Sequence, residues 1–390
     1  MSVAQEARRT GVDAEIVEAV RRYVRAEVAP VATRLEREGA HPLVFGPALA
    51  EMGLFGAGID ERYGGLSLNE ATRVRIVEEL AYAWASLAGT VTTIWVAGGL
   101  IQTFGTEEQK EHWLPKLAAG EVIASISLSE PHAGSDTSAL LCRAVLDGDE
   151  YVIDGSKTWV TNGSKANLIV LAARTGDRLS AFLVERDPAT PAATLSVSRP
   201  FDKLGHRASD TVEMAYSGHR IPASSLLGGP DLLGRGQHAF LNRIDVGRMH
   251  VGAIALGLAR AALDHSISYA AQREAFGKPI DQHQAIAFKL ADMAVRVRSA
   301  ELMLDHAAAR YDAGEDIQLA CSMAKLVCSE AGLFVTKEAL RIHGGIGYVS
   351  DLPIERYYRD VPLEAIGEGT NEIQHIVISR WLKKHGGLPR

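Results

Sequence analysis

The chain has 390 residues, 47% hydrophobic and 23% charged, which is typical of a globular protein but too long for one compact core. Its formal net charge of −7 argues against general nucleic-acid binding, because that function needs a basic face. The three cysteines have neither a CxxC spacing nor clustered histidines, so we predict neither a disulfide framework nor a metal site. They lie at Cys142, Cys321 and Cys328, and free thiols there suit a reducing, cytoplasmic location.

The N-terminus is polar and does not look like a secretory signal, and we expect no stretch of the apolar length of a membrane span. From Val12 to about Leu117 the pattern is helical, with glycines interrupting it near residues 53–56 and 61–65. Residues 69–86 are predicted to form one long helix. The very apolar residues 87–104 are predicted to form a second, buried helix.

Strand-like runs separated by turn residues begin near Glu121. Hairpins are predicted at Asp147-Gly148-Asp149-Glu150 and at Asp154-Gly155. We therefore expect a small antiparallel β domain. Its strands are expected at 122–128, 142–146, 151–153, 168–172 and 180–184.

Helical periodicity returns near Gly236 and continues to the end. Long helices are predicted at 246–272, 282–313, 317–340 and 371–384, and short connections favour an antiparallel four-helix bundle. The fold class is therefore α+β. An N-terminal all-α domain is expected at 1–120, a middle β domain at 121–229 and a C-terminal bundle at 230–390.

The run Gly367-Glu368-Gly369-Thr370 places one carboxylate between two glycines, just before a helix. Glycine lets the backbone and a bound molecule approach closely. A carboxylate beside free backbone N–H groups suits proton abstraction next to a carbonyl, since the N–H groups stabilise the oxygen that gains charge. Taken alone, the motif is better explained as a loop with a solvated acid, and the other motifs of the chain change this balance.

Two motifs in the β region are candidates for contact with a planar or anionic group. Ser129-Glu130-Pro131-His132-Ala133-Gly134-Ser135-Asp136 combines small residues with hydroxyls, although a plain turn capped by Asp136 explains it equally well. Lys157 to Gly163 alternates along a strand, which puts Trp159 and Thr161 on one face. A half-buried tryptophan in a sheet is the alternative explanation.

Three further motifs lie in the C-terminal helical region. Arg273, followed by Phe276 and Gln284, suits a pyrophosphate, or is a helix C-cap cation. The glycine-rich turn that starts at Arg341 follows a helix, so it is not a Rossmann fingerprint. Asp245 and Arg248 share a helix face and are otherwise a surface ion pair.

In this order the motifs resemble those of the acyl-CoA dehydrogenase family of flavoproteins, from about residue 61 to residue 380. The resemblance implies an FAD cofactor, an acyl-CoA substrate, an electron-transferring flavoprotein as acceptor and a homotetramer. Glu368 would be the catalytic base, which forms a trans-2-enoyl thioester as FAD N5 takes the hydride. FAD contacts are implied for Ile126, Leu128, Ser129, Ser135, Trp159, Val160, Thr161, Arg273, Phe276, Gln284, Arg341, Gly344, Gly345, Thr370 and Glu372, in part from a neighbouring subunit, and substrate contacts for Ser135, Asp245, Arg248 and Gly369.

Four positions bear on how far the resemblance carries. Arg341 replaces a usual glutamine, and Ser129 a usual threonine. Gly367 stands where many members have a bulky residue, which suggests room for a branched, cyclic or aromatic acyl group. Some members place the base at the position of Gly247, and here that position has no side chain.

Three other functions remain as alternatives: an acyl-CoA oxidase, a dehydrogenase of carrier-protein thioesters, and a non-catalytic scaffold subunit. Peroxide formation without an electron acceptor would favour the first of these. A preference for carrier thioesters would favour the second, and a colourless protein unable to take up FAD the third.

Overall fold

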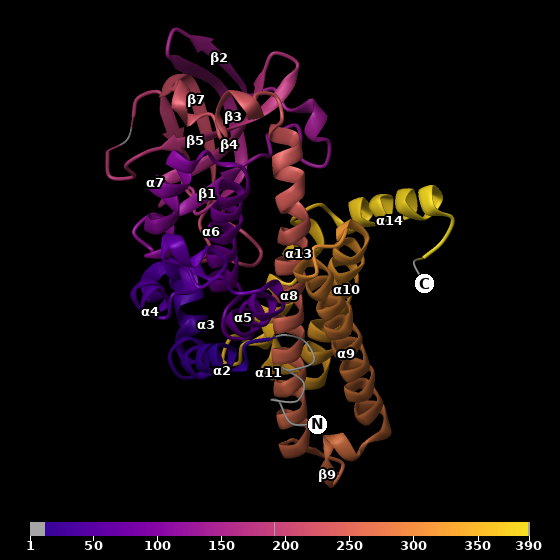
Figure 1. The fold of residues 1–390 in the computed structure, drawn as a ribbon. Coiled ribbons are helices and arrows are strands. Elements are labelled where there is room, and N and C mark those ends of the chain that lie inside the picture. Colours follow the sequence, from indigo (N-terminus) through magenta and orange to yellow (C-terminus); the bar gives the residue numbers. More distant parts are fainter. Residues whose placement is uncertain (1–11, 191, 389–390) are drawn as a thin grey trace.

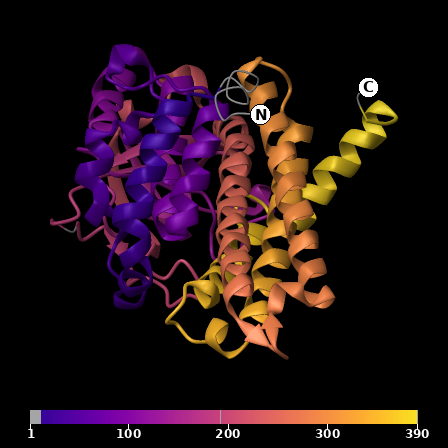
Figure 2. The same ribbon diagram turned by 90° about the horizontal axis from the view of Figure 1, so that it is seen from below.

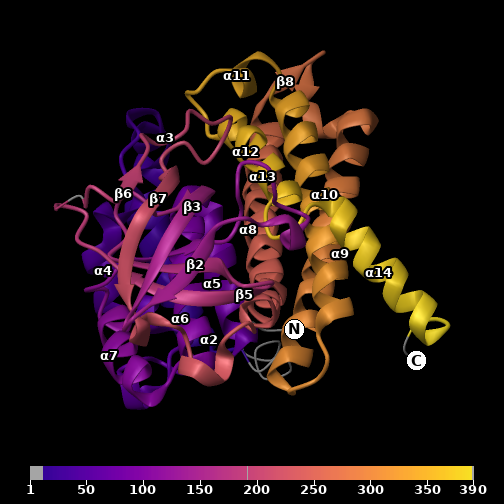
Figure 3. The same ribbon diagram turned by 90° about the horizontal axis from the view of Figure 1, so that it is seen from above.

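The structure is a computed structural model that describes residues 12–190 and 192–388. It has an N-terminal helical part, a β part and a C-terminal helical part, so the predicted architecture is confirmed (Figure 1). The β part covers one end of the N-terminal helices, and the long C-terminal helices lie beside both (Figures 1 and 3).

The N-terminal part is helical throughout, and its polar caps explain where the helices begin. Asp13 caps the first described helix, and Thr106 and Gln109 form a capping box at α7. The predicted break between the two long helices falls at Trp84, whose extended backbone (φ −160°, ψ 107°) separates α5 from α6. The helices are α2 (Ala14–Tyr23), α3 (Ala29–Glu38), α4 (Gly46–Glu51), α5 (Glu70–Ala83), α6 (Ala85–Phe104) and α7 (Glu107–Ala118), with a π-helical turn at Val24–Val28.

The β part is a mixed sheet, which corrects the prediction of a purely antiparallel one. Its order is β1-β4-β2-β3-β7-β6, with β5 paired to β4. β1 runs parallel to β4, because the long segment that forms β2 and β3 lies between them in the chain and returns the backbone in the same direction. The strands are β1 (Ala124–Ser127), β2 (Arg143–Asp147), β3 (Glu150–Thr161), β4 (Leu168–Thr175), β5 (Arg178–Glu185), β6 (Leu195–Val197) and β7 (Thr211–Pro222).

One predicted hairpin is present and the other is wrong. The turn between β2 and β3 lies at Asp147–Glu150, with Gly148 at φ 66°. Asp154-Gly155 instead lies within β3, where the register against β7 shifts and Gly155 has φ 142°. A Cβ on Gly155 would meet the backbone of Cys142 at 2.7 Å, so close packing rather than a turn requires glycine here.

The C-terminal part differs from the predicted four-helix bundle in its last helix. α8, α9 and α10 pack together, and α5 of the N-terminal part packs on α8 and α9. α14 packs on α10 at its start and then extends away from the bundle (Figures 1 and 2). The elements are α8 (Gly236–Gln272), β8 (Glu274–Ala275), β9 (Lys278–Pro279), α9 (Gln284–Asp312), α10 (Gln318–His343), α11 (Gly345–Tyr348), α12 (Ile354–Asp360), α13 (Pro362–Ile366) and α14 (Asn371–His385).

Three helices are long and apolar enough to cross a membrane by length and composition, contrary to the expectation from the sequence. They are α6, α8 and α10, and 61%, 89% and 67% of their most apolar windows are buried inside the protein. Much of their apolar surface therefore packs against the other helices and the sheet.

Candidate active site

Glu368 lies in the short link between α13 and α14. Its backbone is left-handed, with φ 52°, and Gly369 beside it has φ 84°. Leu363 accepts the N–H of Gly367 at 2.8 Å, and the Thr370 hydroxyl caps α14 by accepting the N–H of Ile373 at 3.4 Å. Left-handed backbone at a non-glycine residue is costly and concentrates at functional sites. Trp159 and Phe276, two other predicted site residues, share this feature, with φ 60° and 54°.

The carboxyl group of Glu368 packs against α8 at Gly247. A Cβ at Gly247 would lie 2.9 Å from both Cδ and Oε2 of Glu368. The missing side chain at Gly247 therefore makes the space in which the carboxyl group sits.

Burial raises the pKa of the Glu368 carboxyl to about 7, and the nearby cations Arg248 and Lys325 oppose this rise. Arg248 also donates from Nε to the Glu368 carbonyl oxygen at 3.4 Å, and from Nη1 to Asp245 at 2.5 Å. The Arg248 residue is only 6% exposed, so the Asp245–Arg248 pair is not the exposed ion pair of the alternative interpretation. It lies directly beside Glu368.

A second group of predicted residues lies at the end of β3. Trp159 is 62% exposed, while Val160 beside it is fully buried. The regular alternation predicted from Lys157 is nevertheless interrupted, because Lys157 and Thr158 are both buried and the register shifts before Val160. The strand end is fixed, because the Ser125 hydroxyl donates to the Thr161 carbonyl at 2.6 Å and Asn162 Nδ2 to the Thr90 carbonyl at 3.1 Å. An exposed indole on a rigid strand is a surface for a planar ligand.

Two residues that the motif analysis did not single out join the Ser129 loop to this strand. Lys157 Nζ donates to Glu130 at 2.7 Å and to the Leu128 carbonyl at 2.8 Å, and both charged side chains are buried. The N–H of Thr158 also donates to the Ser129 carbonyl at 3.0 Å. The sequence offered one signal for this pair: an acidic residue in one motif and a basic residue in the other.

The rest of the 129–136 loop is open on one side. A Cβ on Gly134 would have no atom within 4 Å, and Ser135 is exposed. Asp136 caps the following turn by accepting the N–H of Ser138 at 3.0 Å, as the simple-turn explanation requires. Ile126 and Leu128 are partly buried against the helical core.

The remaining predicted FAD residues form a separate cluster at the far end of α8. Arg273 and Phe276 belong to the β8–β9 hairpin, which Figure 1 shows at the opposite end of α8 from the sheet. Phe276 is 97% exposed. The turn after α10 lies at the same end, because His343 stacks on Tyr269 of α8 with ring centroids 4.4 Å apart. The further members of this cluster are Gln284, Arg341, Gly344 and Gly345.

Within one chain the structure does not bring the Arg273 cluster next to the Glu368 site. Gly247, which packs against Glu368, and Arg273 are 26 residues apart along α8, about 39 Å at 1.5 Å per residue. Thr370 and Glu372 at the start of α14 lie beside Glu368, and so do Asp245 and Arg248.

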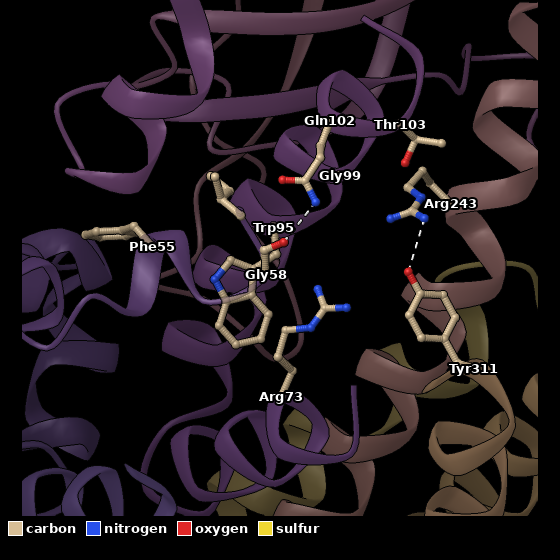
Figure 4. Close-up of a pocket in the computed structure, with 10 residues that line it drawn as sticks. Phe55, Gly58, Arg73, Trp95, Gly99, Gln102, Thr103, Arg243 and Tyr311 are labelled. Carbon is tan, nitrogen blue, oxygen red and sulfur yellow. Dashed lines mark hydrogen bonds between the residues drawn. The ribbon is translucent and has the colours of Figure 1, made fainter. Parts of the chain in front are cut away.

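A cavity of about 70 Å³ lies between α5, α6 and α8. Figure 4 shows the Arg73 and Arg243 guanidinium groups and the Trp95 indole around it. The indole is fixed by a 2.6 Å hydrogen bond from Nε1 to the Leu54 carbonyl, and a Cβ on Gly99 would lie 2.7 Å from Arg243. None of the residues that the resemblance implies for contact with flavin or substrate lines this cavity.

Comparison with known proteins gives one family for all three parts. Residues 12–121 match the acyl-CoA dehydrogenase N-terminal domain, 125–218 the middle domain and 234–383 the C-terminal domain. A probable acyl-CoA dehydrogenase of Bacillus subtilis (strain 168) is 39% identical over 94% of this chain and 97% of that protein. The mitochondrial short-chain specific acyl-CoA dehydrogenase of Bos taurus is 38% identical over 93% of this chain and 88% of its own length.

Two solved structures are similar throughout. Butyryl-CoA dehydrogenase from Megasphaera elsdenii superimposes with a TM-score of 0.90 at 32% identity, covering 95% of this chain and 97% of that one. A glutaryl-CoA dehydrogenase from Mycobacterium smegmatis in complex with FADH2 gives a TM-score of 0.90 at 28% identity, covering 95% and 94%.

Proposed function

Since this chain belongs to the acyl-CoA dehydrogenase family, we propose that Glu368 is the base that removes the α-proton of an acyl-CoA thioester. The observation that carries this proposal is the carboxyl group of Glu368 held against Gly247, with its pKa raised to about 7. A base whose pKa lies near neutral pH is ionised in sufficient amount and still binds a proton well.

The backbone around Glu368 supports the same role. Its N–H donates to no group in the described part of the chain, so it is available to a thioester carbonyl oxygen that gains charge. Arg248 holds the Glu368 carbonyl, and Gly367, where a Cβ would meet only the Leu363 oxygen, leaves the approach on that side open. The product is a trans-2-enoyl thioester.

FAD is the cofactor of this enzyme family, and when bound it accepts the hydride from the substrate Cβ. The residues present fit it. The exposed Trp159 indole offers a face for a flat ring, and the side-chain hydroxyls of Ser129 and Thr161 lie on adjoining segments. A Cβ on Gly134 would have no atom within 4 Å, so the backbone there leaves room for the cofactor to approach closely.

We propose that a second copy of the chain completes the FAD site. The cluster around Arg273 and Phe276 lies about 39 Å along α8 from Gly247 and Glu368, although both groups belong to the predicted set. The almost fully exposed Phe276 ring in this cluster is accessible to a second copy of the chain. Reduced FAD would pass its electrons to an electron-transferring flavoprotein.

The test is anaerobic bleaching of the flavin absorbance by an added acyl-CoA. Glu368→Gln keeps the shape of the side chain but removes the base, so the variant should retain FAD and lose at least about 10²-fold in bleaching rate. Bleaching at the wild-type rate in the FAD-loaded variant would remove Glu368 from this role. A panel of straight, branched and aromatic thioesters tests the room at Gly367, where a Cβ would meet only the Leu363 oxygen at 3.5 Å.

A further inference from the structure

Lys325 of α10 is a buried cation near the proposed base. Its residue surface is 0% exposed, and in the described part of the chain no carboxylate lies in ion-pair range of its ammonium group. Its hydrogen-bond acceptor is the Asn371 side-chain oxygen, at 2.9 Å. A buried charge without a close counter-ion is expensive, and it is kept where the charge has a use.

The face of α10 that carries Lys325 is directed at the segment containing Glu368. Ser322, Lys325 and Ser329 recur at intervals of three and four residues, so they share this face. The Ser322 hydroxyl accepts from Arg248 Nη1 at 3.4 Å, and the Ser329 hydroxyl donates to the same Asn371 oxygen at 3.0 Å. Asn371 follows Glu368 by three residues and opens α14.

We propose that Lys325 is a positioning residue whose ammonium group stabilises the carboxylate form of Glu368 and, through Asn371, holds the start of α14. This inference rests on the proposed role of Glu368. It adds a second cation to that site, in a different position from Arg248.

The charges around Lys325 support this assignment. Burial lowers the pKa of Lys325 to about 8, Glu364 and Glu368 oppose the fall, and Arg248 adds to it. Glu364 is already 2.9 Å from the His206 ring, and Arg248 is 2.5 Å from Asp245. Glu372 of α14, the remaining anion nearby, is exposed to solvent. The Glu368 carboxylate, whose charge is poorly solvated although the residue is partly exposed, is therefore the anion that Lys325 can stabilise without an existing close partner.

Removing the charge should raise the pH at which Glu368 ionises. We expect Lys325→Met to move the midpoint of the bleaching rate against pH upward by about one pH unit, the lower end of the effect of a nearby opposite charge. At pH 7 the rate should fall about fivefold, as follows from such a displacement of a midpoint near 7, and at high pH it should recover. Lys325→Gln keeps a donor for Asn371 and should give the same displacement.

Ser329→Ala is the matched control, because it removes a hydrogen bond to the same Asn371 oxygen and leaves the charge. Its midpoint should stay at the wild-type value. If both Lys325 variants bind FAD and keep the wild-type midpoint, or if Ser329→Ala moves it equally, the electrostatic role is wrong. If Lys325→Met fails to fold, the midpoint measured for Lys325→Gln tests the proposal instead. Glu368→Gln separates the two proposals: fast bleaching in that variant overturns the base itself, whatever Lys325 does.

Discussion

At the residue scale, desolvation of the Glu368 carboxyl group raises its pKa, which suits a base, but it also lowers the free energy of unfolding when the group is ionised. Its pKa is raised from 4.5 to about 7 by burial, so the folded protein binds this proton more tightly than the unfolded chain does. Ionisation therefore destabilises the fold progressively as the pH rises from about 4.5 to about 7, and the whole penalty is present above that range.

Glu368→Gln should therefore raise the unfolding temperature at pH 8 by a few degrees, since the variant buries no charge. At pH 4.5 the gain should be much smaller. Thermal unfolding followed by circular dichroism at both pH values measures it. Glu372→Gln, at an exposed position on α14, is the control and should not gain stability at pH 8. An equal gain at both pH values would contradict the assigned shift.

At the element scale, the position of α8 depends on where its glycines meet other helices. A Cβ at Gly257 would lie 2.4 Å from the Glu78 carbonyl and 2.9 Å from the Ala81 Cβ. An alanine at position 257 would therefore force α5 to move away from α8. A Cβ at Gly252 would meet Cys328 at 3.5 Å, which is ordinary contact.

These two glycines predict opposite results for the same substitution. Gly257→Ala should lower the free energy of unfolding by about 1–3 kcal/mol through overpacking. Gly252→Ala, in the same helix, should be neutral or raise it by up to about 1 kcal/mol, since alanine favours helix. Urea unfolding measures both. Similar losses in the two variants would show that α5 does not constrain α8 as described.

The elements also show what the sequence predicted and what it did not. Helix periodicity and caps identified α5, α6, α9 and α10 within a few residues, because their apolar faces are long and continuous. β7 was missed because its alternation of buried and exposed residues breaks at Ser217-Gly218, where Gly218 has φ 60° and the sequence looks like a turn. The outward course of α14 depends on tertiary contacts, which periodicity does not contain.

The same division applies to the site. The motif order identified the family, as the comparisons confirm, and it put Glu368 and Trp159 forward as candidates. The Lys157–Glu130 pair and Lys325 were not singled out, because a lysine in a strand or a helix is usually solvated. Only packing showed that both lysines are fully buried.

At the scale of the whole molecule, the distance between the predicted FAD residues around Arg273 and those beside Glu368, together with the exposed face of α9, favours association of copies. Phe288, Val295 and Leu302 are spaced seven residues apart, and all three are exposed. A stripe with that spacing follows one side of a helix and suits packing against another helix.

The family resemblance implies a homotetramer, and we predict that FAD binding depends on its assembly. Val295→Glu places a charge within the α9 stripe, so light scattering should show dissociation, and bound FAD should fall several-fold because the Arg273 cluster leaves the flavin. Val145→Glu introduces the same charge at an exposed position on β2, outside α9, and should change neither. A wild-type protein that is monomeric with full FAD content would contradict the prediction, since one chain would then hold the cofactor with only the residues around Trp159 and Glu368.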